Sequence, residues 1–498
     1  MMALENPAGA RREAEGHTMP QPPEEGYQSP LSTRYAGPEM QRLFSDVHRA
    51  RLFRELWLIL AEGQRELGLP ITQLQVEQLR AHTQSVDLER VNRLEKELRH
   101  DVMAHLKAYA ADCPDAAPIL HLGATSCYVT DNADILIVRD AMRLVRARLV
   151  GVARRLSAFA RAHKALPALA YTHFQPAQPT TLGKRACLWL QDVLSDLSEA
   201  EHFLQTLRPL GSKGATGTQA SFLSLFSGDH EQVKALDRYV TRRMGFERPV
   251  AVSGQTYSRK TDSRALQALS GIAQSACKFS NDVRLLQHLK EVEEPFGDAQ
   301  VGSSAMPYKR NPMRCERMAG LARFILNNTG NAEDTAAAQW LERTLDDSAN
   351  RRLALAQGFL AADGLLRLYD GVAGGLVVYP KMMEKHLREE LPFLATENIL
   401  MQGVLAGGDR QMLHGRLRAH AMAAGDRVKS EGLSNDLLAR VAADPAFGLG
   451  SEDLEKLLDP RDYTGRAERQ VDEYLDGEAA EALKGYTEVG AAEADVGV

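Results

Sequence analysis

The sequence predicts an all-α protein built around a bundle of long helices. Apolar residues recur at alternating spacings of three and four from Ile135 to Phe159, which makes a heptad seam. We expect this helix to end near Pro167, a second long helix over 182–207, and a third over 261–291 with its own seam from Leu269 to Leu286. Helices of this length pack as bundles and bury their seams against one another or against partner subunits.

The pattern on either side of this bundle predicts two smaller helical domains. Residues 1–27 are rich in Pro, Gly and Glu and contain few large apolar side chains, so we expect them to be disordered. Beyond Gly374–Gly375 the helical patterns become shorter and proline breaks appear between them. The predicted division is a disordered segment at 1–27, an N-terminal helical domain at 28–125, the central bundle at 126–378, a C-terminal helical domain at 379–484 and a disordered tail at 485–498.

Composition narrows the class of protein. The chain has 498 residues with 60 basic and 66 acidic side chains, which argues against a nucleic-acid-binding surface. Five cysteines without a Cys-x-x-Cys pair, and fourteen histidines without a ligand pair, imply a reduced cytoplasmic protein with no metal. No apolar run reaches membrane-spanning length and the N-terminus lacks the apolar region of a signal peptide, so no membrane partner is expected.

Two segments before the bundle carry clustered polar residues. A helix expected over 87–111 contains Arg99-His100-Asp101, and consecutive helical residues point about 100° apart. The three side chains therefore cannot all face one ligand from a regular turn, unless the helix breaks there or a ligand wraps around it. The loop from His121 to Ser126 ends in two hydroxyls, and Thr130 or Asp131 is the expected N-cap of the next helix.

The stretch Gly302–Pro312 contains two prolines, a glycine and paired serines, so it must be a loop. Basic residues follow closely, with Glu316 the one acid among them: Lys309, Arg310, Arg314, Arg317 and Arg323. A local basic cluster in an acidic chain predicts a small anionic ligand. The alternative is a charged helix start that only contacts solvent.

A second rigid loop is expected over 171–181, where two prolines and two glutamines follow Phe174. Such a loop would hold the imidazole of His173 in place beside Thr172. A lone histidine in a loop is more often a surface or structural residue. After the 302–312 loop, helices are expected over 312–330 and 353–368, with Arg343, Ser348 and Arg352 between them. By themselves, these three residues read as a polar helix face.

The 302–312 loop resembles the signature of the fumarase/aspartase superfamily, Gly-Ser-Ser-x-Met-Pro-x-Lys-x-Asn-Pro, and every fixed position is present. The Thr-His-x-Gln segment that begins at Thr172 is also similar to that superfamily. Within it, the chain resembles the adenylosuccinate lyase family of the animal type, from about residue 29 to about 480. The resemblance implies a homotetramer whose bundles form one multi-helix core, with each active site shared by loops from three subunits.

This resemblance also implies a reaction and its residues. The reaction is a β-elimination that breaks a C–N bond and releases fumarate from two small-molecule substrates of purine biosynthesis, adenylosuccinate and succinylaminoimidazole-carboxamide ribotide, without a cofactor. Ser303 is the implied base, His173 the acid and Glu316 its partner, and Lys309, Asn311, Thr125 and Ser126 hold carboxylates. The remaining implied substrate-binding residues are Arg34, Tyr35, Arg99, His100, Asp101, Thr172, Gln255, Arg317, Arg343, Ser348 and Arg352.

Two alternatives remain open at this stage. Another lyase of the superfamily, acting on argininosuccinate or fumarate, would share the 302–312 loop and His173 but would need no phosphate grip. The pairs Arg34-Tyr35 and Arg343/Arg352 argue against it, although Arg34 and Tyr35 alone would read as packing and surface residues. The other alternative is a non-catalytic relative that uses the bundle as a scaffold. Such a chain could lose Ser303 or His173, and this chain keeps both.

Overall fold

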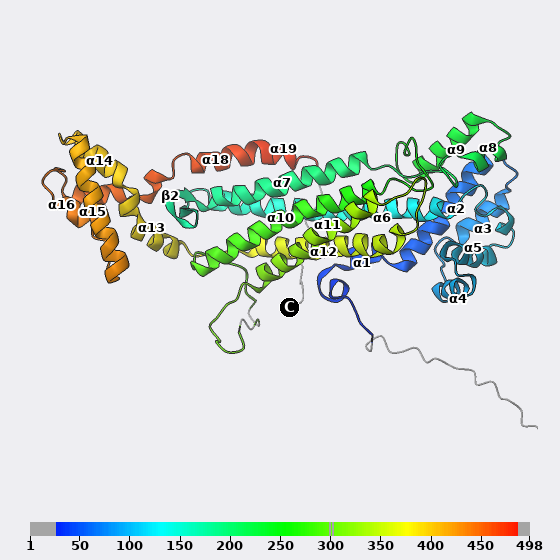
Figure 1. Ribbon diagram of the computed structural model, residues 1–498, viewed down its shortest axis with the longest axis horizontal. Coiled ribbons are helices and arrows are strands. Elements are labelled where there is room, and N and C mark those ends of the chain that lie inside the picture. Colours follow the sequence, from blue (N-terminus) through cyan, green and yellow to red (C-terminus); the bar gives the residue numbers. More distant parts are fainter. Residues whose placement is uncertain (1–25, 298–299, 301–302, 487–498) are drawn as a thin grey trace, which may run out of the picture.

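The computed structural model describes residues 26–297, 300 and 303–486, and these residues form an elongated helical molecule (Figure 1). The predicted all-α class is confirmed. Within the described residues, strands are confined to two antiparallel pairs, β1 (Pro167–Thr172) with β2 (Gln175–Thr181) and β3 (Val292–Glu293) with β4 (Val377–Val378). The segments predicted to be disordered lie largely outside the described residues, as does Gly302 of the 302–312 loop.

The central bundle consists of five long helices that lie side by side in Figure 1. They are α6 (Ser126–Ala162), α7 (Leu182–Thr206), α10 (Lys260–His288), α11 (Met313–Ala337) and α12 (Asp347–Gly375). The predicted seam from Ile135 to Leu156 is buried along α6. Phe279 stacks on Tyr369 with ring centroids 4.4 Å apart and meets Trp189 edge-on at 5.1 Å. This aromatic contact joins α7, α10 and α12 in the middle of the bundle.

Helix α12 begins earlier than the sequence analysis predicts. Ser348 and Arg352 lie within its first two turns. Of the three residues expected between helices, only Arg343 lies there. Side-chain contacts with α11 account for the extra length. The Asn350 amide donates to Asn331 at 2.9 Å, and the Thr335 hydroxyl donates to Asn350 at 3.2 Å. Partners on a neighbouring helix thus stabilise turns that have a weak apolar pattern.

The N-terminal part packs around Trp57 as a second hydrophobic core. The helical stretch from Pro38 to Glu66 is divided near Phe44, because the Ser45 side chain caps a new helix by accepting from the backbone N–H of His48. Phe222 and Leu236 join this core from further along the chain. The elements are the helical turn Leu31–Tyr35, α1 (Pro38–Leu43), α2 (Asp46–Glu66), α3 (Gln73–Ala81), α4 (Leu88–Leu98), α5 (Asp101–Asp112), the turn Ala117–Ile119, α8 (Ala220–Leu225) and α9 (His230–Arg243).

The C-terminal part has a third core around Leu413 and Phe447. Its chain then returns to the central bundle, and α18 lies along α7 in Figure 1. Val471 is buried in the central core, and Lys164 bonds to Asp472 at 2.6 Å. The domain boundaries proposed from composition stay predictions. The elements are α13 (Pro380–Leu394), α14 (Thr396–Leu405), α15 (Arg410–Glu431), α16 (Leu437–Ala442), α17 (Ser451–Glu455), the turns Lys456–Leu458 and Pro460–Tyr463, α18 (Ala467–Tyr474), the turn Leu475–Ala479 and α19 (Ala480–Ala482).

Candidate active site

The described part of the 302–312 loop is free of helix and strand, as predicted, and joins α10 to α11. The Ser303 Oγ accepts from the backbone N–H groups of Ala305 at 3.3 Å and Met306 at 3.1 Å. The N–H of Lys309 donates to the Met306 carbonyl at 2.9 Å, which closes a tight turn. Two backbone donors therefore point at the Ser303 oxygen, and such donors stabilise negative charge on an oxygen.

The loop ends at the first turn of α11. The Asn311 carbonyl accepts from the N–H of Met313 at 2.8 Å, directly where the helix begins. Glu316 is exposed on this turn and Arg317 is half-buried beside it. The implied carboxylate-holding and catalytic residues of this region therefore lie on the exposed loop and at the exposed start of α11, available to a ligand or a neighbouring chain.

The segment 171–181 forms a hairpin, so the expectation of a loop is wrong for most of it. Strands β1 and β2 pair from Pro167 with Thr181 to Thr172 with Gln175. The prolines are tolerated because both strands of a two-stranded hairpin are edges and leave some N–H groups unpaired. His173 and Phe174 form the two-residue turn with φ angles of 53° and 57°. Both are positive, as a type I′ turn requires, and at Phe174 this is strained.

This turn places His173 at the exposed tip of the hairpin, with Thr172 exposed beside it. The rings of Tyr171 and Phe174 pack at 5.7 Å and support the turn from within. Burial, followed by the charge of Glu291, raises the pKa of Tyr171 to about 12. The structure holds the imidazole out on a stiff support.

The helix predicted over 87–111 breaks at Arg99-His100-Asp101. Arg99 adopts a left-handed φ of 51° and ends α4, and the His100 ring nitrogen accepts from the N–H of Met103 to begin α5. The Asp101 carboxylate bonds to Arg352 of α12 at 2.9 Å. The break turns the three side chains in different directions and brings Asp101 to a predicted phosphate-binding residue. Both partners of this pair are solvent-accessible, so the ion pair contributes little to stability.

Thr125 occupies the N-cap position of α6 and Ser126 is its first residue. The expectation that Thr130 or Asp131 caps this helix is wrong, since both lie inside it. Asp131 instead accepts from the guanidinium of Arg259 at 3.0 Å, a partner 128 residues away. The N-terminus of a long helix presents free N–H groups and a partial positive charge, which favour an anion.

Several predicted binding residues gather near this helix start. The Gln255 side-chain oxygen accepts from Cys127 at 3.6 Å, and the Gln255 backbone N–H donates to the carbonyl of Glu342 at 3.0 Å. Arg343 follows and reaches Asp347 at 3.4 Å. We call this set the end group, and its members are Asp101, Thr125, Ser126, Gln255, Arg343, Ser348 and Arg352.

A buried ion-pair network lies directly beneath the end group. Arg259 bonds to Asp131 at 3.0 Å and Asp347 at 2.6 Å, with 1% of its side chain exposed. Arg351 bonds to Asp262 at 2.6 Å and Asp134 at 3.0 Å. Burial opposes ionisation of Asp134, but Arg49 and Arg351 outweigh it and lower its pKa. The network therefore joins the starts of α6, α10 and α12.

Arg34 and Tyr35 lie apart from the end group within this chain. Tyr35 packs against Gly364, in the middle of α12, and its carbonyl accepts from Arg367 at 2.8 Å. Arg34 is exposed. Gly364 lies twelve residues beyond Arg352 in α12, or about 18 Å along the helix.

His173 and Ser303 also lie away from the end group. Helix α6 has 37 residues, so about 55 Å separates Ser126 from the end that leads to the hairpin. Figure 1 shows β2 near the opposite end of the bundle from α2 and α5. Among the described residues, none of the hydrogen bonds or ion pairs links His173 or Ser303 to the end group. One chain thus holds two separated parts of the predicted site.

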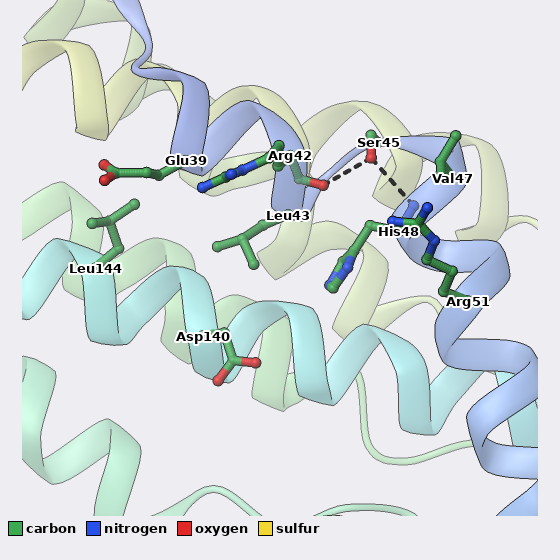
Figure 2. Close-up of a pocket in the computed structure, with 9 residues that line it drawn as sticks. All are labelled: Glu39, Arg42, Leu43, Ser45, Val47, His48, Arg51, Asp140 and Leu144. Carbon is green, nitrogen blue, oxygen red and sulfur yellow. Dashed lines mark hydrogen bonds between the residues drawn. The ribbon is translucent and has the colours of Figure 1, made fainter. Parts of the chain in front are cut away.

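A cavity lies elsewhere in the chain (Figure 2). It has a volume of about 610 Å³ between α1, α2 and α6, and its lining includes Leu43, His48 and Asp140. Figure 2 shows Ser45 at its rim bonded to the Arg42 carbonyl and to the backbone N–H of His48. None of the predicted site residues lines it. In the part of the chain that the structure describes, no group of three or more potential ligands is placed to hold a metal, and no helix is long and apolar enough to cross a membrane.

His121 is a residue that the sequence analysis did not single out, although it begins the loop that leads to Thr125. Its ring nitrogen accepts from the Trp57 indole N–H at 2.8 Å, and its backbone has a left-handed φ of 62°. Burial, followed by the charge of His100, lowers its pKa to about 4. The imidazole is therefore neutral near pH 7. Its position at the start of the loop from His121 to Ser126 is the sequence feature that could have identified His121.

The chain is similar to known proteins in sequence and in fold. The family model described as "Lyase" matches residues 62–326, and the model "Adenylosuccinate lyase C-terminus" matches residues 392–474. A crystal structure of a fumarate lyase from Mesorhizobium sp. BNC1 superimposes with a TM-score of 0.76 at 26% identity, covering 89% of this chain and 99% of that chain. A 3-carboxy-cis,cis-muconate lactonizing enzyme from Pseudomonas putida shares the fold at 24% identity, covering 91% of this chain and 98% of that chain, with a TM-score of 0.77.

The fold and the matching model define the chain as a member of the lyase family. Two curated relatives narrow this assignment. Adenylosuccinate lyase of Saccharomyces cerevisiae is 49% identical, covering 93% of this chain and 97% of the relative, and that of Schistosoma mansoni is 47% identical over the same shares. The chain belongs to the adenylosuccinate lyase family, as the 302–312 loop predicted.

The buried His121 predicts a pH-dependent stability. Its pKa is about 4 in the folded chain and 6.5 when unperturbed, so the unfolded chain binds a proton first as the pH falls. The resulting stability is present above pH 6.5 and is lost progressively between pH 6.5 and pH 4. We expect His121→Asn, which tolerates a positive φ and does not titrate, to remove about 2 kcal/mol of the wild-type loss between pH 7 and pH 5. Urea denaturation at both pH values measures this, and equal pH slopes in the two proteins would contradict it.

Proposed function

We propose that this chain cleaves adenylosuccinate to AMP and fumarate, and succinylaminoimidazole-carboxamide ribotide to the carboxamide ribotide and fumarate. The end group is the observation that carries this choice among lyases. Arg352 follows Ser348 by one helical turn in α12, and Arg343 reaches Asp347, the residue before Ser348. Arginine with a hydroxyl is a common way to hold a phosphate. An argininosuccinate or fumarate lyase has no phosphate to hold. The arginines therefore favour a nucleotide substrate.

The reaction requires a base, an acid and stabilisation of negative charge. We assign Ser303 as the base that removes the proton next to a substrate carboxylate. The N–H groups of Ala305 and Met306 already donate to its oxygen, and this lowers the cost of an alkoxide there. Lys309 and Asn311 would hold the carboxylate that gains charge, together with Thr125 and Ser126 at the start of α6.

We assign His173 as the acid that protonates the departing nitrogen, with Glu316 as the partner that favours its charged form. The stiff hairpin tip suits this role, because proton transfer needs a fixed imidazole. The remaining contacts proposed for the substrate come from Arg34, Tyr35, Arg99, His100, Thr172 and Arg317. The elimination balances without electron transfer, so acid–base groups suffice and no cofactor is proposed.

The distance between the two parts of the site supports a shared active site. About 55 Å of α6 separates the end group from the hairpin side of the bundle, so one chain cannot close the site by a small movement. Antiparallel packing of bundles in a homotetramer would bring the end group of one chain beside the loops of others. We propose that three subunits contribute to each site, and that the enzyme works in the cytoplasm without a nucleic-acid or membrane partner.

The direct test adds adenylosuccinate to the purified protein and follows fumarate formation by absorbance, with argininosuccinate and fumarate in parallel. The proposal is supported if fumarate is released from adenylosuccinate and the other two substrates do not react. Turnover of argininosuccinate or hydration of fumarate instead would assign the chain to another lyase reaction. No turnover of any of the three by an intact tetramer would favour a non-catalytic relative.

Ser303→Ala is expected to abolish turnover while the assembly and substrate binding stay close to wild type. Among the described residues, the hydroxyl accepts hydrogen bonds only from two N–H groups of its own loop, so its loss costs the fold little. Steady-state kinetics, mass measurement and calorimetric titration with adenylosuccinate separate these effects. Near wild-type turnover in the variant would remove Ser303 from the mechanism.

Arg343→Ala and Arg352→Ala are each expected to weaken binding of adenylosuccinate by roughly ten- to hundredfold, because a charge-assisted contact is worth about 1.5–3 kcal/mol. An analogue that lacks the phosphate is expected to bind these variants and the wild type alike. Calorimetric titration of both ligands provides the measurement. An equal loss of affinity for the two ligands would show that the arginines do not hold the phosphate.

Mixed tetramers test the sharing of sites. Tetramers of Ser303→Ala alone or His173→Ala alone are expected to be inactive, since every site lacks one group. After dissociation and reassociation together, some sites would receive both intact residues, and part of the activity is expected to return. Subunit exchange that is demonstrated by mass but restores no activity would mean that both residues come from one chain.

A further inference from the structure

The short segment between α10 and the 302–312 loop contains a buried carboxylate that has no part in the proposed chemistry. Glu294 is 2% exposed and follows directly after β3. One of its oxygens accepts from the backbone N–H of Arg314 at 2.9 Å, and the other accepts from that of Cys315 at 2.8 Å. The Cys315 thiol also hydrogen-bonds to it. Three donors from the first turn of α11 thus converge on one side chain.

This carboxylate supplies the cap that α11 lacks in its own sequence. Pro312 occupies the N-cap position and offers no side-chain acceptor. Helix α11 therefore begins with N–H groups that need an acceptor from elsewhere in the chain. Glu294 fills this need from 20 residues upstream, and its negative charge faces the positive end of the helix.

A second contact joins the two ends of the segment that carries the 302–312 loop. We call these ends, residues 287–294 and 310–315, the neck. Gln287, in the last turn of α10, donates from its amide to the Arg310 carbonyl at 2.9 Å. Its amide oxygen accepts from the backbone N–H of Glu294 at 3.3 Å. One side chain therefore spans the point where the chain leaves toward the 302–312 loop and the point where it returns. Glu293 adds an ion pair to Arg310 at 3.7 Å.

The base of this neck is fixed to the C-terminal part of the chain. Val292 and Glu293 pair with β4, and the Glu291 carboxylate bonds to His386 of α13 at 2.8 Å. The Tyr379 hydroxyl donates to Glu293 at 3.0 Å. The loop is thus anchored at its ends, whereas from Ser304 to Arg310 its side chains are exposed.

We propose that Glu294 is a positioning residue for the proposed reaction: by clasping the first turn of α11, it fixes where the 302–312 loop presents Ser303, Lys309 and Asn311. Asn311 precedes Arg314 by three residues, so the clasp restrains the approach to the reacting groups from the side of α11. The kinetic part of this inference rests on the proposed function. The structural part, restraint of the loop neck, does not.

The test compares Glu294→Gln with Asp229→Asn. Both changes turn a carboxylate that caps a helix into an amide of similar shape, and Asp229 caps α9 by accepting from Glu231 at 2.9 Å and Gln232 at 3.2 Å. Glu294→Gln leaves one acceptor oxygen for the two backbone N–H donors of Arg314 and Cys315. The new NH₂ group then faces the donor that has lost its acceptor. Because misplacing reacting groups by about 1 Å costs about a hundredfold, we expect kcat for adenylosuccinate to fall ten- to hundredfold with KM within about threefold. Asp229→Asn is expected to keep wild-type kcat.

Hydrogen exchange followed by mass spectrometry provides the second readout. Peptides that cover residues 303–318 are expected to exchange faster in Glu294→Gln, and peptides from α7 and α12 to stay unchanged. Gln287→Leu removes the hydrogen bonds to the Arg310 carbonyl and to the Glu294 backbone N–H but keeps the Glu294 carboxylate. It is expected to shift kcat and exchange in the same direction, and it serves if Glu294→Gln does not fold.

Three results would overturn the proposal. One is wild-type kcat and wild-type exchange in both neck variants, and another is faster exchange throughout the bundle with a matching loss of tetramer. The third is a neck that exchanges faster while kcat is unchanged. If the wild-type protein releases no fumarate from adenylosuccinate, the proposed function fails, and the exchange data still decide whether Glu294 restrains the neck.

Discussion

The buried network of Arg259 and Arg351 with four aspartates is the interaction on which the arrangement of this protein depends. It joins the starts of α6, α10 and α12, and removing one partner would leave a buried charge uncompensated, at a cost of about 3–5 kcal/mol. The end group is built directly on it. Arg352 follows the buried Arg351 and points outward to Asp101, and Arg343 reaches Asp347 of the network. A structural set of ion pairs thus carries the candidate phosphate-binding set on its outer side.

Fixing the helices at one end also decides what happens at the other. Rigid helices of 29 to 37 residues transmit their direction over about 43–55 Å, and they deliver the hairpin and the 302–312 loop to the far side of the bundle. The end group itself adjoins large exposed apolar side chains, with Trp340 75% and Leu341 98% accessible in the single chain. Exposed apolar surface beside an incomplete polar site is typical of a surface that another subunit covers. This supports the proposed assembly.

The proposed catalytic groups lie on the few non-helical pieces of the chain. A regular helix presents neighbours about 100° apart, whereas the turn of the β1–β2 hairpin and the 302–312 loop place a side chain at a tip. Strain accompanies this at Phe174, whose φ of 57° is unfavourable for an aromatic residue and is held by the pairing of β1 with β2. For the 302–312 loop, the corresponding support is Glu294, which accepts from the first turn of α11. Each support is a backbone or buried contact made away from the reacting atoms.

The sequence by itself determined the long helices, the loop at 302–312 and the family, because periodicity, prolines and a fixed motif are local properties of the chain. It also predicted most of the residues of the end group, although from the motif and not from geometry. Only the tertiary structure decided which of them meet. The sequence predicted Asp131 as a helix cap, but in the structure it bonds to Arg259, 128 residues away. Nothing in the local sequence distinguishes Glu294 from another acidic residue before a loop. The prolines of 171–181 predicted a loop where the chain forms a hairpin. The hairpin is a local contact that the prolines obscured. Asp131 and Glu294, in contrast, bond to partners 128 and 20 residues away, and no local pattern encodes a contact with a residue that only folding brings near.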